Sequence, residues 1–302
     1  VCNQLDPQGT MKRIFFIIPL VILFSLTGLT QRFYIQGSGG YAFGFLKENM
    51  STALLTAKVR SDTLYDQVSQ NESHLFSFGT GGRLALGVGM KLNDYLSLEL
   101  AGFYNPCKTL KTEASEYYTY TEGGFFFDFN EHHTYKGREF GFLPAVKFSL
   151  PAGSLRPYAR IGIIFSFISL TYNYEGTYLT THPMYYPTGS ERSTLEAKRS
   201  LNLGAAADFG FEITLADRLF FFLEANGSFI SYRPKKATYT EYVVNGDDIL
   251  GDLTTYEKEV VYVKNYTWTD SVDDDSPRER VYITFPFSSL GLSAGLRFNF
   301  FQ

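Results

Sequence analysis

The sequence predicts an all-β protein, a transmembrane antiparallel up-and-down β-barrel of eight strands. Three observations predict it. Residues Leu290 to Phe300 alternate without a break between apolar residues and small or polar ones. Aromatic residues reach 17% of the chain, although the mean hydropathy is only -0.11. Finally, the connections between the alternating segments are in turn a tight turn and a long polar stretch, which is typical of a barrel that faces lipid outside and water inside.

The N-terminal part is interpreted as an export signal. The basic residues Lys12 and Arg13 follow Met11, and an apolar run then ends near the small residues Gly28 and Thr30. A single transmembrane anchor is the alternative, but the run is shorter than the ~18 residues that a spanning helix needs. We therefore assign residues 1–10 to a non-native start upstream of Met11, residues 11–30 to a cleaved signal peptide, and residues 31–302 to the barrel domain.

Eight segments alternate with period two and are long enough to cross a bilayer as tilted strands, which takes ~9–11 residues. Along each segment one face carries Phe, Leu, Ile and Val, whereas a soluble sandwich would place polar residues on its outer face. The predicted strands are Phe33–Phe45, Phe76–Leu92, Tyr95–Tyr104, Glu139–Leu150, Arg156–Phe167, Ser200–Leu215, Leu219–Tyr232 and Pro286–Phe301.

The connections between these segments fall into two kinds. Residues 93–94, 151–155 and 216–218 are short and have turn chemistry. Residues 46–75, 105–138, 168–199 and 233–285 are long and polar, and they predict extracellular loops opposite short periplasmic turns. Asn245-Gly246 is a hairpin signal within residues 238–268, which predicts a hairpin that projects above the membrane. A ten-stranded barrel, in which this hairpin joins the wall, is the alternative.

The interior of the barrel follows from the rule that side chains alternate faces along a strand. The inward positions are mostly small or polar, and ten of them are charged. Because an unpaired buried charge costs several kcal/mol, equal numbers of the two signs predict a paired network that plugs the lumen. The simplest role for it is structural, and a small gated pore is the alternative. The charges are Arg83, Lys91, Lys147, Arg160 and Arg297 against Glu99, Glu139, Asp208, Glu212 and Glu224.

The histidines are the candidates for catalysis. All four, His74, His132, His133 and His182, fall in predicted loops or at a strand mouth. Acidic and hydroxyl neighbours supply the residue types for general-base chemistry, but solvated loop histidines are the simpler interpretation. His132 and His133 beside Glu131, or the run Asp273–Asp275, have no specific coordination spacing. We therefore predict no metal, no cofactor and no catalytic residue.

Tyrosines are abundant in the predicted loops, where they suit either ligand contact or an aromatic girdle at the membrane interface. The sequence leaves these two roles open. The residues concerned are Tyr117, Tyr118, Tyr120, Tyr172, Tyr174, Tyr178, Tyr185, Tyr186, Tyr256, Tyr262 and Tyr266.

The chain resembles bacterial outer-membrane proteins in its last strand. Leu296, Phe298, Phe300 and Phe301 are similar to the C-terminal assembly signal of that class, although Gln302 follows the last aromatic residue. Over residues 31–302 the chain resembles small OmpA/OmpX-like or porin-like barrels, and its loops are similar to those of Bacteroidetes barrels. The resemblance implies a Gram-negative outer membrane, contact with its lipid and lipopolysaccharide, assembly by the barrel insertion machinery, and no cofactor.

These patterns favour a non-enzymatic barrel that stabilises the envelope or contacts an extracellular ligand through its tyrosine-rich loops. A narrow diffusion channel is the second hypothesis, and an enzyme that modifies lipid A is the third. The net charge of -4 gives no basic footprint for nucleic acid. After cleavage only Cys107 remains, so a disulfide within the chain is excluded.

Overall fold

The computed structural model describes residues 32–45, 48–49, 65–71, 75–120, 125–151, 153–180, 188–265 and 273–300. The predicted signal peptide, the residues before it, and Phe301 and Gln302 lie outside these ranges. Within the described ranges no helix has the length and apolar character needed to cross a membrane.

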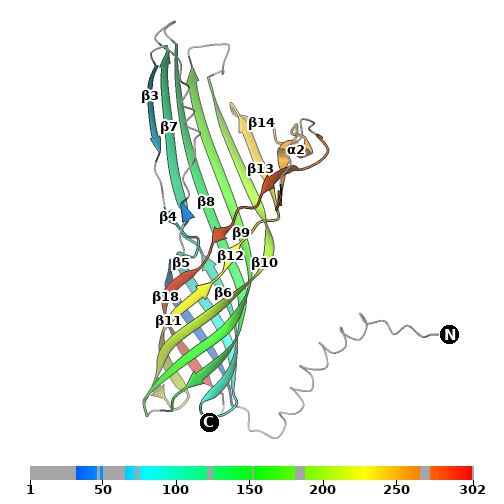
Figure 1. The fold of residues 1–302 in the computed structure, drawn as a ribbon. Helices are drawn as coiled ribbons and strands as arrows, with labels where there is room; N and C mark the ends of the chain where they lie inside the picture. Colours follow the sequence, from blue (N-terminus) through cyan, green and yellow to red (C-terminus); the bar gives the residue numbers. More distant parts are fainter. Residues whose placement is uncertain are drawn as a thin grey trace, which may run out of the picture.

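Eight strands form a closed antiparallel barrel (Figure 1). Each strand pairs with its two neighbours, and the pairing of the first barrel strand with the last closes the ring, for example at Gly40 opposite Ser293. The predicted eight-stranded barrel is confirmed, and the ten-stranded alternative is wrong. The barrel strands are β1 (Arg32–Gly44), β5 (Gly81–Lys91), β6 (Leu96–Pro106), β8 (Phe125–Ser149), β9 (Leu155–Thr180), β10 (Gly189–Ala216), β11 (Leu219–Phe229) and β18 (Ser289–Asn299).

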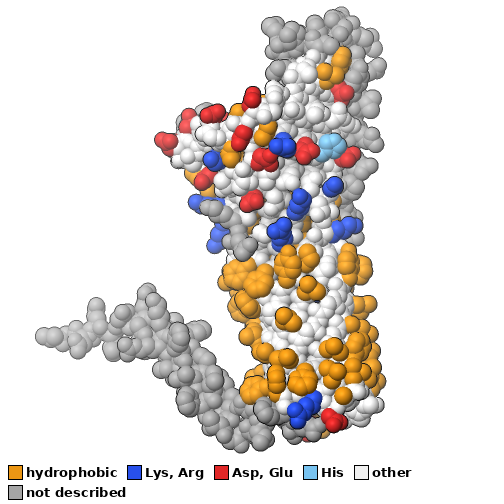
Figure 2. All heavy atoms as spheres, turned by 180° about the vertical axis from the view of Figure 1, so that it is seen from behind, with side chains coloured by type: hydrophobic (Ala, Val, Ile, Leu, Met, Phe, Trp, Pro, Cys, Tyr) orange, Lys and Arg blue, Asp and Glu red, His pale blue; other side chains and the backbone are white. Residues whose placement is uncertain are grey.

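The outer face of the barrel is an apolar band (Figure 2). Large apolar side chains on it are widely exposed, as with Leu86 at 76% and Leu203 at 66%. On β8 the outward residues run from Lys136 and Arg138 into Phe140, so the apolar band begins between the last two of these. Such an exposed apolar surface is stable only against lipid.

The predicted tight turns lie together at one end of the barrel, the end where β18 finishes (Figure 1). In the β5–β6 turn the Asn93 side chain accepts hydrogen bonds from the N–H groups of Tyr95 and Leu96, at 2.9 and 2.8 Å. In the β8–β9 turn Gly153 adopts a φ of 59°, a left-handed conformation that favours glycine. The local sequence therefore determines this end of the barrel.

At the other end the predicted long loops are largely strand, so the loop prediction for residues 105–138 and 168–199 is wrong. Strands β8, β9 and β10 continue past the barrel and form an open sheet outside the band (Figure 1). We call it the outer sheet. Thr and Tyr, which are frequent here, favour strands wherever a neighbouring strand supplies backbone partners. The other strands of the outer sheet are β3 (Tyr65–Asn71), β7 (Leu110–Tyr120), β13 (Lys236–Val244), β15 (Glu259–Val263) and β16 (Arg278–Val281).

The predicted hairpin forms at the tip of β13. Asn245 and Gly246 both have positive φ, at 54° and 93°, and β14 (Asp247–Asp248) pairs back onto β13. The following turn of helix, α2 (Thr255–Lys258), is closed at its start by a reciprocal pair of hydrogen bonds between Thr254 and Glu257. Four short strands complete the fold: β2 (Glu48–Asn49), β4 (Leu75–Phe76), β12 (Ser231–Tyr232) and β17 (Phe285–Pro286).

Candidate functional site

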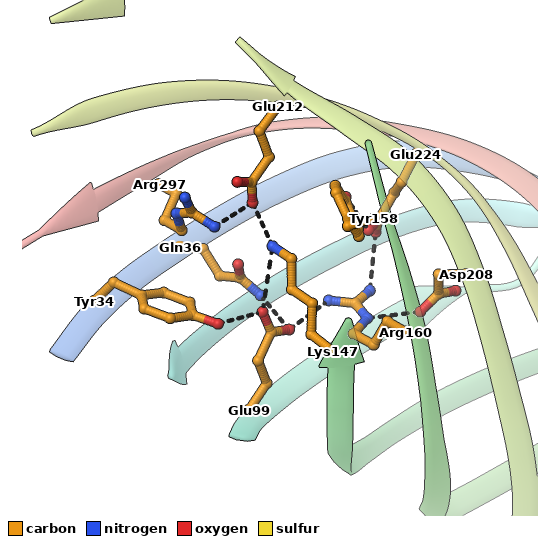
Figure 3. A network of polar contacts seen from close by, with 10 residues as sticks. All are labelled: Tyr34, Gln36, Glu99, Lys147, Tyr158, Arg160, Asp208, Glu212, Glu224 and Arg297. Carbon is orange, nitrogen blue, oxygen red and sulfur yellow. Dashed lines mark hydrogen bonds and ion pairs between the residues drawn. The ribbon is translucent and has the colours of Figure 1, made fainter. Parts of the chain in front are cut away.

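The centre of the barrel interior is a cluster of paired charges around Arg160 (Figure 3). The guanidinium of Arg160 donates to three carboxylates from three other strands. Its distances are 2.7 Å to Asp208, 3.0 Å to Glu99 and 3.0 Å to Glu224. All four side chains are buried. One cation therefore neutralises and holds together carboxylates from β6, β10 and β11.

A second group of charges lies next to the first and shares Glu99 with it (Figure 3). Lys147 and Arg297 both contact the Glu212 carboxylate, and the Lys147 ammonium is also 3.6 Å from Glu99. The same ammonium lies 4.0 Å from the centre of the Tyr158 ring, a cation–π geometry. The two groups form one network, which we call the lumen network.

Two tyrosines and a glutamine complete the lumen network, and the predicted network left them out because it counted only charged residues. The Tyr34 hydroxyl donates to Glu99 at 2.5 Å, and the Gln36 amide donates to the same carboxylate at 3.0 Å. The Tyr158 hydroxyl donates to Glu224 at 2.8 Å. The available signal was alternation in β1, whose even-numbered residues face inward.

The structure brings seven of the ten predicted charges into the lumen network: Glu99, Lys147, Arg160, Asp208, Glu212, Glu224 and Arg297. The other three lie apart. Arg83 is over the ring of Phe103 at 5.2 Å, and Glu139 accepts from Asn105 and Ser166 at 2.6 and 2.8 Å. Half-buried Lys91 lies 6.0 Å from the centre of the Phe220 ring.

Side chains fill the lumen at the level of the network. A cavity of about 20 Å³ lies between Arg83, Arg160 and Glu224. This is room for about one water molecule. Charges packed in this way gain most of their stabilisation from one another, because bulk water does not reach them.

Gly89 lies under the Tyr34 ring and leaves it space: a Cβ there would be 2.2 Å from a ring carbon. We expect Gly89→Ala to displace Tyr34 from Glu99 and to lower the free energy of unfolding by about 1–3 kcal/mol. Urea titration of the protein in lipid vesicles measures this. Gly39→Ala is the matched control, because a Cβ at this position meets Leu84 at an ordinary 3.6 Å. Equal effects of the two changes would contradict the role of Gly89.

Aromatic side chains close the mouth of the barrel above the lumen network. Phe78 stacks on Phe287 with ring centres 5.4 Å apart, and Phe285 meets the Phe78 ring edge-on at 5.8 Å. Tyr232 packs against both Phe285 and Phe287. These four side chains, at most 7% exposed, are the mouth plug. A 2.9 Å hydrogen bond from the Phe78 N–H to the Pro286 carbonyl joins the two chain segments that supply the three phenylalanines.

The mouth plug corrects two predicted strand boundaries. The prediction ran a strand from Phe76 and another from Pro286, but β5 begins at Gly81 and β18 at Ser289. A turn just before β5, closed by a 3.3 Å hydrogen bond from the Thr80 N–H to the Ser77 carbonyl, takes Phe78 out of the strand register and into the barrel. Even-numbered residues of β5 face lipid, which is why alternation alone placed Phe78 outside.

A polar cluster lies on the face of the outer sheet that continues the lumen wall. His133 is 5% exposed, and its ring nitrogens lie 2.7 Å from the Tyr172 hydroxyl and 3.2 Å from Glu131. Tyr174 donates to the same Glu131 at 3.0 Å. Burial, and then the nearby charge of Glu131, raises the pKa of Tyr174. The cluster keeps its hydroxyl protons at neutral pH.

The predicted loop positions of the histidines and tyrosines need correction. His132 and His133 lie in β8; exposed His132 is 3.4 Å from Glu113, and His133 is not a solvated loop residue. His74 and His182 lie outside the described residues. The tyrosines divide among β7 (Tyr117, Tyr118, Tyr120), β9 (Tyr172, Tyr174, Tyr178), α2 (Tyr256) and β15 (Tyr262), whereas Tyr185, Tyr186 and Tyr266 lie outside the described ranges.

The acidic run Asp273–Asp275 forms a turn, in which Asp273 accepts from the Ser276 hydroxyl and from the Asp275 N–H. In the described part of the chain, no three or more His, Cys, Asp or Glu side chains group as a metal site would. At the C-terminal end, Leu296 and Phe298 point toward lipid, and the Phe298 and Phe300 rings meet edge-on at 5.6 Å.

A closed antiparallel barrel with an apolar band, a polar interior and tight turns at one end defines a small transmembrane β-barrel of the outer-membrane type. Two solved structures are similar to the chain. Neisserial surface protein A has 12% identity and a TM-score of 0.35, over 89% of this chain and 97% of that one. Outer membrane protein OprG from Pseudomonas aeruginosa has 13% identity and a TM-score of 0.39, over 90% and 96%. No protein-family model and no curated protein sequence matches the chain.

Proposed function

We propose that the protein is a non-conducting outer-membrane barrel that holds its outer sheet in the extracellular space for ligand contact. The observation that carries this proposal is the double closure of the lumen. The lumen network fills the middle of the barrel, and the mouth plug covers the end that leads to the outer sheet. A diffusion channel needs a continuous polar path, and both layers interrupt it.

The outer sheet supports the second half of the proposal. Strands β8, β9 and β10 run from the barrel into it. Backbone pairing between β8 and β9 and between β9 and β10 lies on both sides of this passage, with one register shift between Ala197 and Ser200. Binding surfaces built on strands hold their side chains more firmly than loops do. A barrel that only stabilised the envelope would not need this extension.

Two further features support an outer-membrane location. Exposed Lys136 and Arg138 lie directly above the apolar band, at the level where the phosphate groups of lipopolysaccharide would lie. On β18, the side chains of Leu296, Phe298 and Phe300 form an apolar outward face. We propose that the barrel insertion machinery binds this face. An export signal in residues 11–30 would deliver the chain to this membrane.

An enzymatic role has less support. His133 is hydrogen-bonded through both ring nitrogens, so it would have to leave Tyr172 or Glu131 before it could take a proton from a substrate.

Conductance measurement in planar bilayers tests the proposal directly. The refolded full chain is expected to insert without producing conductance steps, while a general porin in the same bilayer conducts. Heat-modifiable migration on gels shows that the inserted protein is folded. Reproducible steps from folded protein would overturn the closed-lumen proposal and favour the diffusion channel.

A further inference from the structure

A pocket of about 330 Å³ lies directly above the mouth plug, on the inner face of the outer sheet. Phe285 belongs both to the plug and to the pocket wall, and the remaining wall comes from β8, β9, β10, β13, β15 and β16. This volume is near the lower limit of about 300 Å³ for ligand pockets. The pocket therefore suits a small molecule.

The wall of the pocket is mainly apolar, with a few polar groups that converge on it. Leu170 and Leu195 contribute aliphatic surface beside Phe285. Tyr135 and Tyr172 also line the pocket. Burial, followed by the charge of Glu131, raises the pKa of Tyr135 to about 12, so this hydroxyl remains a hydrogen-bond donor at neutral pH. Few convergent polar groups in an apolar wall are typical of a site that orients an apolar ligand.

Arg280 gives the pocket its charge. Its guanidinium acts electrostatically on both Tyr172 and Tyr262, which line the pocket. In the described part of the chain, no carboxylate lies within ion-pair distance of Arg280. The neighbouring Arg278 is different, because it is placed over the Tyr256 ring at 4.8 Å. Arg280 is thus available to an anion, and Arg278 provides a comparison on the same strand.

We propose that the pocket binds a small apolar carboxylate, with its charged group on Arg280 and its apolar body between Leu170, Leu195 and Phe285. A guanidinium matches a carboxylate with two parallel hydrogen bonds. The inference rests on the proposed function, since it names the class of ligand that the outer sheet contacts.

Binding of 2-naphthoate, a bicyclic acid of suitable size, tests the inference. Isothermal titration of the full chain in lipid nanodiscs is expected to show saturable binding that empty nanodiscs lack. Arg280→Gln is expected to weaken it by about tenfold, the effect of losing one charged contact. Arg278→Gln is the matched control and should leave the affinity within about twofold. The neutral analogue 2-naphthalenemethanol should bind about tenfold more weakly than the acid.

Three results would overturn the inference: no saturable binding of 2-naphthoate, equal binding of the neutral analogue, or equal effects of the two arginine changes. Leu195→Trp, which adds a large ring to the pocket wall and keeps Arg280, should abolish binding, and retained affinity would also contradict the site. Conductance of the same preparation separates the two proposals. A barrel that neither conducts nor binds 2-naphthoate contradicts only the inferred ligand class. A barrel that conducts contradicts the proposed function, whatever it binds.

Discussion

Replacing Arg160 by alanine is expected to lower the free energy of unfolding by about 3–5 kcal/mol, the cost of breaking a buried ion pair. The change removes one cation from three buried carboxylates. Glu99 keeps contacts with Lys147 and Tyr34, but Asp208 loses the one partner that its carboxylate has in the described structure. A buried, unpaired carboxylate is the main source of the expected loss.

Urea titration in lipid vesicles, followed by heat-modifiable migration, measures this loss. Arg192→Ala is the control, because its 2.7 Å pair with Glu241 is exposed on the outer sheet and should change stability by no more than about 0.5 kcal/mol. Arg160→Ala with Asp208→Ala should recover part of the loss, since both partners are then absent. An Arg160→Ala barrel as stable as the control variant would show that the lumen network contributes nothing to stability.

The barrel could be predicted from the sequence because membrane and lumen impose opposite demands on alternate residues. In β18, Leu292 and Leu296 must face lipid, whereas Ser293 and Arg297 must face the interior, and a shift by one residue would reverse both. The same demand identified the inward charges. Which charges pair could not be predicted, since the contact between Arg160 on β9 and Glu99 on β6 depends on the relative stagger of distant strands.

The outer sheet could not be predicted in the same way, because beyond the membrane no lipid requires one face of a strand to be apolar. Residues Thr171, Tyr172, Asn173 and Tyr174 of β9 are all half-buried and mostly polar, so neither face stands out in the sequence. Their strand conformation comes from pairing with β8 and β10. Without that long-range pairing, a stretch rich in Tyr, Thr and Asn is hard to distinguish from a loop.

The mouth plug was missed for a different reason, a local change of direction in the backbone. The turn over Ser77–Thr80 moves Phe78 from the lipid side to the interior. Phe285 and Phe287 keep the inward positions that alternation gives them. In the sequence alone, however, two aromatic residues at a strand end are equally typical of an aromatic girdle at the membrane interface. Only the packing of these rings against Tyr232 distinguishes a plug from a girdle.

The two layers that close the lumen are expected to act in series, so that opening the barrel requires a change in both. Phe78→Ala alone should lower the free energy of unfolding by about 3–5 kcal/mol, the cost of a large cavity. The barrel should nevertheless stay silent in planar bilayers, because the lumen network still fills the section below. Adding Arg160→Ser and Asp208→Ser shortens both members of the closest pair at once, while Glu99 keeps Lys147 and Glu224 keeps the Tyr158 hydroxyl.

This triple variant is expected to show conductance steps, since the space released by Arg160 and Asp208 joins the cavity of about 20 Å³ beside them and opens toward the unplugged mouth. Phe209→Ala in place of Phe78→Ala is the control: Phe209 is 65% exposed on the lipid face, and the resulting barrel should stay silent. Conduction by Phe78→Ala alone would mean that the plug is the whole barrier. Silence of a folded triple variant would mean that other side chains, and not these two layers, close the lumen.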